Sequence, residues 1–110
     1  PLEFLREPSL LAVPDDFALS QNYPNPFNPS TTILFSVPAF GAGMVPTSVD
    51  IFNAIGQRVK VLVQESVQPG YHRAVWTGDD AAGRQVGSGI YFYRVKVGES
   101  LQVRRMTLVK

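Results

Sequence analysis

A short run of prolines places the strongest local constraint on this chain. Pro24, Pro26 and Pro29 are separated by asparagine and phenylalanine, and Tyr23 precedes the first of them. Proline holds φ at about −65° and biases the preceding residue toward extended geometry, so neither a helix nor a regular ladder continues through this run. Asparagine side chains can bond backbone groups without a ladder partner, and aromatic rings suit docking on a core. We predict an ordered, non-repetitive crossing, pinned by Tyr23 and by a mostly buried Phe27.

Strand-like alternation follows the crossing along the rest of the chain. Apolar and polar residues alternate, with Gly- and Pro-containing turn signals between the runs and no helical period. The candidate strands are residues 31–37, 48–53, 59–63, 71–77, 90–97 and 101–109. Gly and Pro are nine residues each, which suits short strands and tight turns. The pattern predicts an all-β immunoglobulin-like sandwich of about seven antiparallel strands, with a small barrel as the alternative.

The alternation also predicts which side chains fill the space between the sheets. Trp76 lies on a mid-chain strand, where a large ring is most useful at the centre of a sandwich. Residues 48–53 and 59–63 are expected to form a hairpin closed by a tight turn at residues 53–56. The predicted core comprises Ile33, Phe35, Val49, Ile51, Trp76, Tyr91, Tyr93 and Val95.

The last strand breaks the simple alternation. Leu101 and Val103 are in phase with each other, but Met106 and Leu108 are out of phase with them. One extra residue in an alternating strand implies a bulge near residues 104–105 or a strand that changes sheets. We therefore expect Leu101 and Val103 to cover the core, so that the sandwich stays folded without residues 106–110.

Several motifs occur along the chain in the same order as in a known family of domains. The residues that carry it are Pro24, Asn25, Pro26, Phe27, Asn28, Gly56, Trp76, Gly89, Tyr91 and Tyr93, followed by the tail Arg104, Arg105, Met106, Thr107, Leu108, Val109 and Lys110. In this order the chain resembles the C-terminal sorting domains (type A) of cargo proteins of the type IX (Por) secretion system, over residues 19–110. The resemblance also implies an immunoglobulin-like sandwich, related to the immunoglobulin-like modules of flagellar hook-capping proteins.

The resemblance implies a non-catalytic address. In that family the domain directs a periplasmic cargo protein through the outer-membrane translocon, and the cargo is then attached to surface lipopolysaccharide or stays at the cell surface. By motif position, residues 104–110 would be the part that the secretion and attachment machinery recognises. An edge strand offers unpaired backbone groups to a partner strand. The three cations of the tail suit an anionic surface or an acidic partner, although edge charges also prevent aggregation of sheets.

Length and composition set the domain organisation. The chain has 110 residues, which fits one domain with a modest core. It begins at Pro1, so we expect a piece of a longer protein, in which residues 1–18 form a tether and residues 19–110 the sorting domain. There is no cysteine, which excludes a disulfide scaffold. No apolar stretch approaches the roughly 20 residues of a transmembrane helix.

Catalysis, cofactors and nucleic acid have little support in the sequence. His72 has no cysteine to activate and no evident serine partner, so we predict no enzyme activity and no cofactor. Asp79 and Asp80 are adjacent in a turn, where they more often cap backbone groups; a Ca²⁺ site there stays open, and no metal ligand is assigned. Nucleic-acid binding is not expected, because Tyr91 and Tyr93 fall on the face opposite to Arg94, and only Phe92 lies beside it.

Two further functions stay open at this stage. A carbohydrate-binding module of a secreted hydrolase would need an exposed aromatic surface from Tyr23, Tyr71, Trp76 and Phe92. A buried Trp76 would remove that mechanism. A structural spacer domain is the other candidate, and it gives no reason for a basic strand at the end of the chain.

Overall fold

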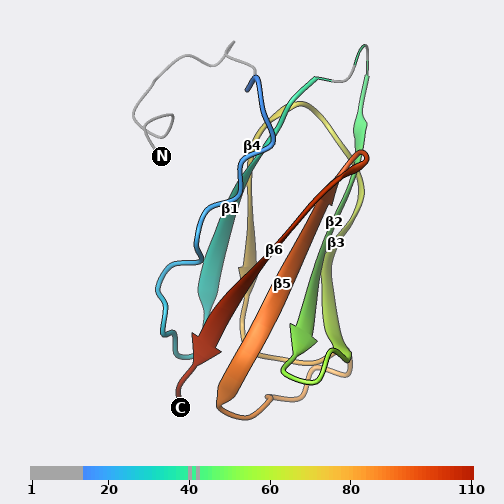
Figure 1. The fold of residues 1–110 in the computed structure, drawn as a ribbon. Helices are drawn as coiled ribbons and strands as arrows, with labels where there is room; N and C mark the ends of the chain where they lie inside the picture. Colours follow the sequence, from blue (N-terminus) through green and yellow to red (C-terminus); the bar gives the residue numbers. More distant parts are fainter. Residues whose placement is uncertain (1–13, 40, 42) are drawn as a thin grey trace.

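Two antiparallel sheets face each other in the computed structural model, which describes residues 14–39, 41 and 43–110. The strands are β1 (Thr31–Val37), β2 (Val45–Asn53), β3 (Arg58–Val67), β4 (Gly70–Trp76), β5 (Gly89–Val97) and β6 (Ser100–Leu108). One sheet has the order β1-β4 and the other β3-β2-β5-β6 (Figure 1). The strands follow the alternation of apolar and polar residues in the sequence. The turns between them contain Gly, Pro or Asn, the residues that favour turns. The described residues contain no helix that could cross a membrane.

The predicted fold class is confirmed: the structure is an all-β, immunoglobulin-like sandwich. The described residues form six regular strands, where about seven were expected. Residues 18–23 partly take the place of the seventh expected strand. They lie along β1 through isolated bridges that pair Leu19 with Phe35 and Tyr23 with Thr32. Prolines just beyond this segment prevent it from continuing as a ladder.

The predicted core is also confirmed. All eight predicted residues are buried, and Trp76 has 0% of its surface exposed. The inward side chains of β1 and β4 meet those of β2 and β5, and burial of this apolar area is the main source of stability for a sandwich. Trp76 lies at the centre, where its indole N–H donates to the carbonyl of Asp79 at 2.9 Å, so the ring is buried without an unpaired donor.

The β2–β3 hairpin is present as predicted. Its turn is organised by Asn53, whose side-chain Oδ1 accepts hydrogen bonds from the backbone N–H groups of Ile55 and Gln57. Gly56 has a φ of 85°, a conformation that glycine adopts without a Cβ clash. Both strands extend beyond the predicted ends, and the ladder has two register shifts, between Val49/Asp50 and Ile51/Phe52.

The crossing is hydrogen-bonded to both sheets, but only one of its two aromatic rings is buried. Phe27 is 2% exposed, as predicted, whereas Tyr23 is 80% exposed. The prediction for Tyr23 was wrong because its backbone N–H and C=O pair with Thr32, and this antiparallel contact directs its ring to solvent. Asn22 is the second buried anchor, and its amide donates to the Thr31 hydroxyl at 2.9 Å.

The N-terminal tether falls mostly on residues 1–13, outside the described residues. The described end of the predicted tether contacts the sandwich. The Ser36 hydroxyl donates to the carbonyl of Asp16 and accepts from the N–H of Ala18, both at 2.8 Å. The domain boundary at residue 19 stays a prediction.

The bulge predicted in the last strand is absent. β6 pairs with β5 in one uninterrupted register, from Val97 with Ser100 to Gly89 with Leu108. The even-numbered positions of β6 face inward throughout, and the odd-numbered positions face outward. The prediction was wrong because it took Leu101 and Val103 as core residues, whereas they are 55% and 52% exposed.

Candidate functional site

The second half of β6 divides its side chains between the core and the surface. Met106 and Leu108 are 0% and 1% exposed, so they belong to the core. The odd-numbered side chains form what we call the outer stripe: Leu101, Val103, Arg105, Thr107 and Val109. All of these are exposed except Thr107, which is partly buried. The exposed side chains of the outer stripe, together with Arg104 and Lys110, are available to a partner of the folded domain.

The first half of β6 faces the chain's own N-terminal segment. Gln102 and Arg104 occupy inward positions, yet they are polar. The Gln102 amide donates to the carbonyl of Phe17 at 3.1 Å, and Arg104 Nε donates to the carbonyl of Leu19 at 3.0 Å. The opposing surface here is polar backbone, and a backbone acceptor near the core requires a donor. This explains the apparent change of phase in the sequence.

The crossing covers the edge of the second half of β6. The N–H of Phe27 donates to the carbonyl of Thr107, and the N–H of Val109 donates to the carbonyl of Phe27, each at 3.0 Å. Asn25 Oδ1 accepts from the N–H of Thr107 at 3.0 Å, and the Gln21 amide donates to the carbonyl of Arg105 at 2.8 Å. The proline-rich motif therefore acts as a clamp on the tail.

Each residue of this motif has a distinct place. Asn25 and Phe27 contact the tail directly, while Pro24, Pro26 and Asn28 are exposed. The carbonyl of Pro24 accepts from the Thr31 hydroxyl at 2.9 Å. Because proline has no backbone N–H, Pro24 and Pro26 add no donor that would need a partner in the crossing.

An aromatic cluster joins the clamp to both sheets. The rings of Phe27 and Trp76 have centroids 5.6 Å apart, and those of Trp76 and Tyr91 are 5.1 Å apart in an edge-to-face arrangement. Such pairs contribute about 0.5–1.5 kcal/mol beyond their burial. The Tyr91 hydroxyl donates to the carbonyl of Gly87 at 2.7 Å, which fixes the approach to β5.

Tyr93 ties β5 to the crossing. Its hydroxyl donates to the carbonyl of Ser20 at 2.7 Å and accepts from the N–H of Asn22 at 2.9 Å. Burial raises the pKa of Tyr93 to about 12, so the hydroxyl keeps its proton at neutral pH. Sequence reasoning placed Tyr93 in the core but did not identify Ser20 and Asn22 as its hydrogen-bond partners. The signal available in the sequence was the run of polar residues 20–22 between Leu19 and the prolines.

Two glycines, Gly78 and Gly89, lie next to the same contacts. Gly78 has a φ of 74°, and a Cβ atom there would lie 3.1 Å from the carbonyl oxygen of Pro29. The end of the crossing and the turn after β4 are thus too close for a side chain. Gly89 begins β5 and is paired with Leu108 in the ladder.

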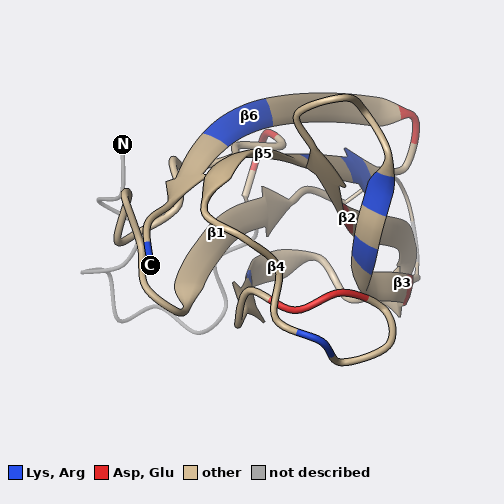
Figure 2. Cartoon of the chain, turned by 90° about the horizontal axis from the view of Figure 1, so that it is seen from below, with Lys and Arg blue, Asp and Glu red and all other residues tan. Residues whose placement is uncertain are grey.

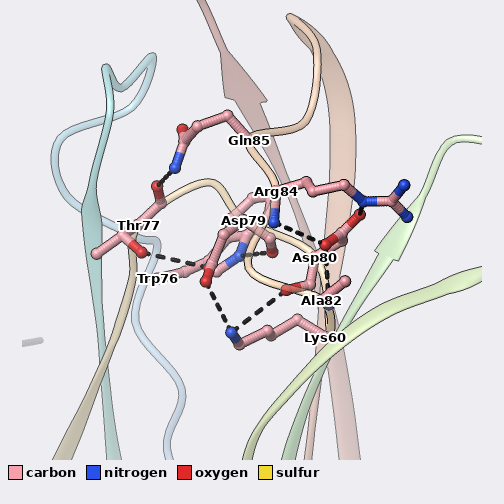
Figure 3. A network of polar contacts seen from close by, with 8 residues as sticks. All are labelled: Lys60, Trp76, Thr77, Asp79, Asp80, Ala82, Arg84 and Gln85. Carbon is pink, nitrogen blue, oxygen red and sulfur yellow. Dashed lines mark hydrogen bonds and ion pairs between the residues drawn. The ribbon is translucent and has the colours of Figure 1, made fainter.

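The two adjacent aspartates organise the β4–β5 connection (Figure 3). Asp79 accepts from Lys60 Nζ at 2.7 Å, and this bond holds the pKa of Asp79 below its ordinary value. Asp80 Oδ1 accepts from the N–H groups of Ala82 and Arg84, each at 2.9 Å, and the bond to Arg84 is the main reason that the pKa of Asp80 is lowered. Among the described residues no group of three or more His, Cys, Asp or Glu could hold a metal ion.

Basic residues mark the tail. Arg104 and Arg105 form a band in β6, and Lys110 lies at the end of the chain (Figure 2). The backbone N–H of Lys110 donates to the Ser88 hydroxyl at 2.9 Å. The structure therefore brings the predicted tail residues together with Asn25, Phe27 and Gly89, while Gly56 lies apart, in the β2–β3 turn.

The aromatic residues proposed for sugar stacking do not share a surface. Trp76 is fully buried, Tyr23 lies on the crossing, and Tyr71 belongs to the two-stranded sheet. Phe92 is partly buried on the four-stranded sheet. The carbohydrate-binding interpretation loses its mechanism.

Comparison with known proteins gives one family match. The family model described as the FlgD Ig-like domain matches residues 40–100. No curated protein matches.

Among solved structures, one match is PorZ, described as an essential bacterial surface component of the type-IX secretion system of human oral-microbiomic Porphyromonas gingivalis. The match has a TM-score of 0.48 and 20% sequence identity, and it covers 87% of this chain and 12% of that chain.

Proposed function

Because the chain belongs to the family of FlgD Ig-like domains, we propose that it is a non-catalytic immunoglobulin-like module that addresses a larger protein to type IX secretion. The module is a C-terminal sorting domain of type A. It directs export of the cargo through the outer-membrane translocon and its retention at the cell surface. The cargo carries out any chemistry. The proposal assigns no residues to lipopolysaccharide.

One observation carries this proposal. Motifs far apart in the sequence meet at the second half of β6: Asn25 and Phe27 clamp its edge, and Trp76 and Tyr91 pack behind Phe27. A spacer domain needs a buried core. It gives no reason for so many of the motif residues to contact a single strand, β6. The arrangement instead presents the outer stripe and Lys110 in a fixed conformation, which is what a receptor for an address requires.

The experiment is an export assay with the whole chain. Residues 1–110 are fused to a reporter that carries a periplasmic export signal, in a bacterium with a type IX system. We expect the reporter at the cell surface or in the medium. The test variant carries Arg105→Gln and Lys110→Gln, which neutralise two exposed cations of the tail. We expect it to stay folded and to lose most of its export.

The matched control neutralises two exposed cations elsewhere. Arg58 begins β3 and Arg73 lies on β4, so Arg58→Gln with Arg73→Gln changes the net charge equally but leaves the tail intact. Export of this control should match that of the unaltered domain. A reporter that stays in the periplasm even with the unaltered domain would contradict the proposal and favour a spacer.

A further inference from the structure

The clamp leaves the first half of the β6 edge uncovered. In the β5–β6 ladder the odd-numbered residues of β6 point their backbone groups away from β5, as the bonds of Thr107 and Val109 to Phe27 show. The same geometry directs the N–H and C=O of Leu101 and Val103, and the N–H of Arg105, outward. Within the described part of the chain, no hydrogen bond reaches these five groups.

The crossing misses this half because it pairs with the other sheet there. The carbonyl of Ala18 accepts from the N–H of Ser36 at 2.9 Å, and the N–H of Ser20 donates to the carbonyl of Leu34 at 3.0 Å. Residues 17–19 meet β6 only through the side chains of Gln102 and Arg104, and the first bond to an outward backbone group of β6 comes from the Gln21 amide, to the carbonyl of Arg105. We call residues 101–105 of β6, with their outward backbone groups, the open edge.

The surroundings of the open edge are apolar and basic. Leu101 and Val103 are exposed on the outer face. Arg104, Arg105 and Lys96, which pairs with Leu101 in the ladder, supply three cations that take part in no ion pair among the described residues. The acids in this region are Glu99, in the turn before β6, and Asp15 and Asp16, which precede Phe17, the partner of Gln102. A second copy of this edge would bring like charges together, so charge complementarity favours an acidic partner.

We propose that the open edge is a docking site for an extended partner segment with acidic side chains, which adds a strand beside β6. Backbone hydrogen bonds to Leu101 and Val103 provide affinity, while the cations around them select the acidic segment. The inference deepens the proposed function and rests on it for the source of the segment, namely the secretion machinery. It adds a backbone contact at the end of β6 opposite to the clamp.

Two substitutions at position 103 distinguish the contribution of the backbone N–H to docking from that of the side chain. Val103→Pro removes the outward N–H and blocks strand addition, yet it spares the ladder to β5, and proline is tolerated on edge strands. Val103→Thr keeps the N–H and has a similar shape. In the export assay we expect Val103→Pro to stay in the periplasm and Val103→Thr to be exported. Leu101→Pro serves as the second variant if Val103→Pro unfolds.

The outcomes separate this inference from the proposed function. If the unaltered fusion is exported and both proline variants are exported equally well, the docking site is wrong and the proposed function stands. Equal loss for Val103→Thr would mean that the side chain is recognised, which also overturns strand addition. If the unaltered fusion is not exported, the proposed function fails. The docking site is then tested by peptide binding to the purified chain in solution.

That binding measurement uses two synthetic extended peptides on the purified chain. One alternates valine with glutamate, and the other alternates valine with lysine. We expect the glutamate peptide to shift the backbone amide resonances of Leu101, Val103 and Arg105, and Val103→Pro to weaken its binding by about fivefold or more, the factor that one backbone hydrogen bond contributes. Equal binding of the lysine peptide, or no shift with either peptide at millimolar concentration, would overturn the proposal.

Discussion

At the scale of single residues, the Tyr93 hydroxyl holds the crossing to the large sheet. It serves the Ser20 carbonyl and the Asn22 N–H at once, and Asn22 is itself buried. A buried N–H without a partner costs about 1–3 kcal/mol. The energetic importance of Tyr93 therefore exceeds what the burial of its ring alone would suggest.

Replacing Tyr93 with Phe should lower the free energy of unfolding by about 1–3 kcal/mol, because the Asn22 N–H loses its acceptor. Chemical denaturation at neutral pH measures this. Tyr91→Phe is the matched control, since its hydroxyl donates one hydrogen bond, to Gly87, and the ring remains in the aromatic cluster. Equal stability loss in the two variants would contradict the assigned role of Tyr93.

At the scale of elements, β6 has two halves with different neighbours. Its first half meets polar backbone of residues 17–19, and its second half is packed into the core and clamped by Asn25 and Phe27. The tail is thus part of the fold as well as the candidate address. Removal of residues 106–110, expected from the sequence to be tolerated, would take Met106 and Leu108 out of the core, so a loss of export after truncation could not be assigned to recognition.

Point substitutions along β6 test this division. Met106→Ala and Leu108→Ala should each cost about 2–5 kcal/mol of unfolding free energy, because both side chains are fully buried. Leu101→Ala and Val103→Ala are the outward-facing controls and should change it by no more than about 0.5 kcal/mol. The opposite ranking in thermal or chemical unfolding would show that the strand has the other phase.

At the scale of the whole molecule, the two sheets are linked along both sides of the sandwich. On one side the crossing bonds first to β1 and then to β6 (Figure 1). On the other side Lys60 of β3 pairs with Asp79 in the β4–β5 connection at 2.7 Å, where both side chains are mostly buried (Figure 3). This ion pair closes the side of the sandwich that the crossing does not reach.

The ion pair predicts an acid dependence of stability. The pKa of Asp79 is lowered in the folded state, chiefly by the hydrogen bond from Lys60. The Asp79 carboxylate therefore takes up a proton less readily in the folded protein than in the unfolded chain. The stability that its charged form contributes is present above about pH 4 and is lost as the pH falls further. Asp79→Asn should make the unfolding free energy less dependent on pH in this range.

Lys60→Gln is the companion variant, because it removes the main cause of the shift and should flatten the same pH profile. Denaturation midpoints between about pH 5 and pH 2.5 measure both variants. If the two variants keep the full acid sensitivity of the unaltered protein, another carboxylate is responsible for it.

Several features of the fold could be predicted because they depend on local rules. Period-two alternation identified the strands and the eight core residues, and the prolines identified the crossing, since both signals act through the chain's own backbone geometry. The Asn53–Gly56 turn could be predicted for the same reason. The candidate site was predicted as a set of tail residues, and the resemblance added Asn25 and Phe27 to it.

Other features depended on neighbours distant in the sequence. Alternation alone could not show that Gln102 and Arg104 face the backbone of residues 17–19, so exposed Leu101 and Val103 were mistaken for core. Tyr23 was mistaken for an anchor because its backbone pairing with Thr32 directs its ring outward.

The sequence by itself determined the class of fold, the core and the order of the motifs, because hydrophobic period and proline geometry are local properties of a chain. Only the tertiary structure decided which half of β6 is clamped and which half is open. That outcome depends on where the segment beside β1 first bonds to the backbone edge of β6, at Gln21. Hydrogen bonds between segments more than 80 residues apart set this position, and no local pattern encodes it.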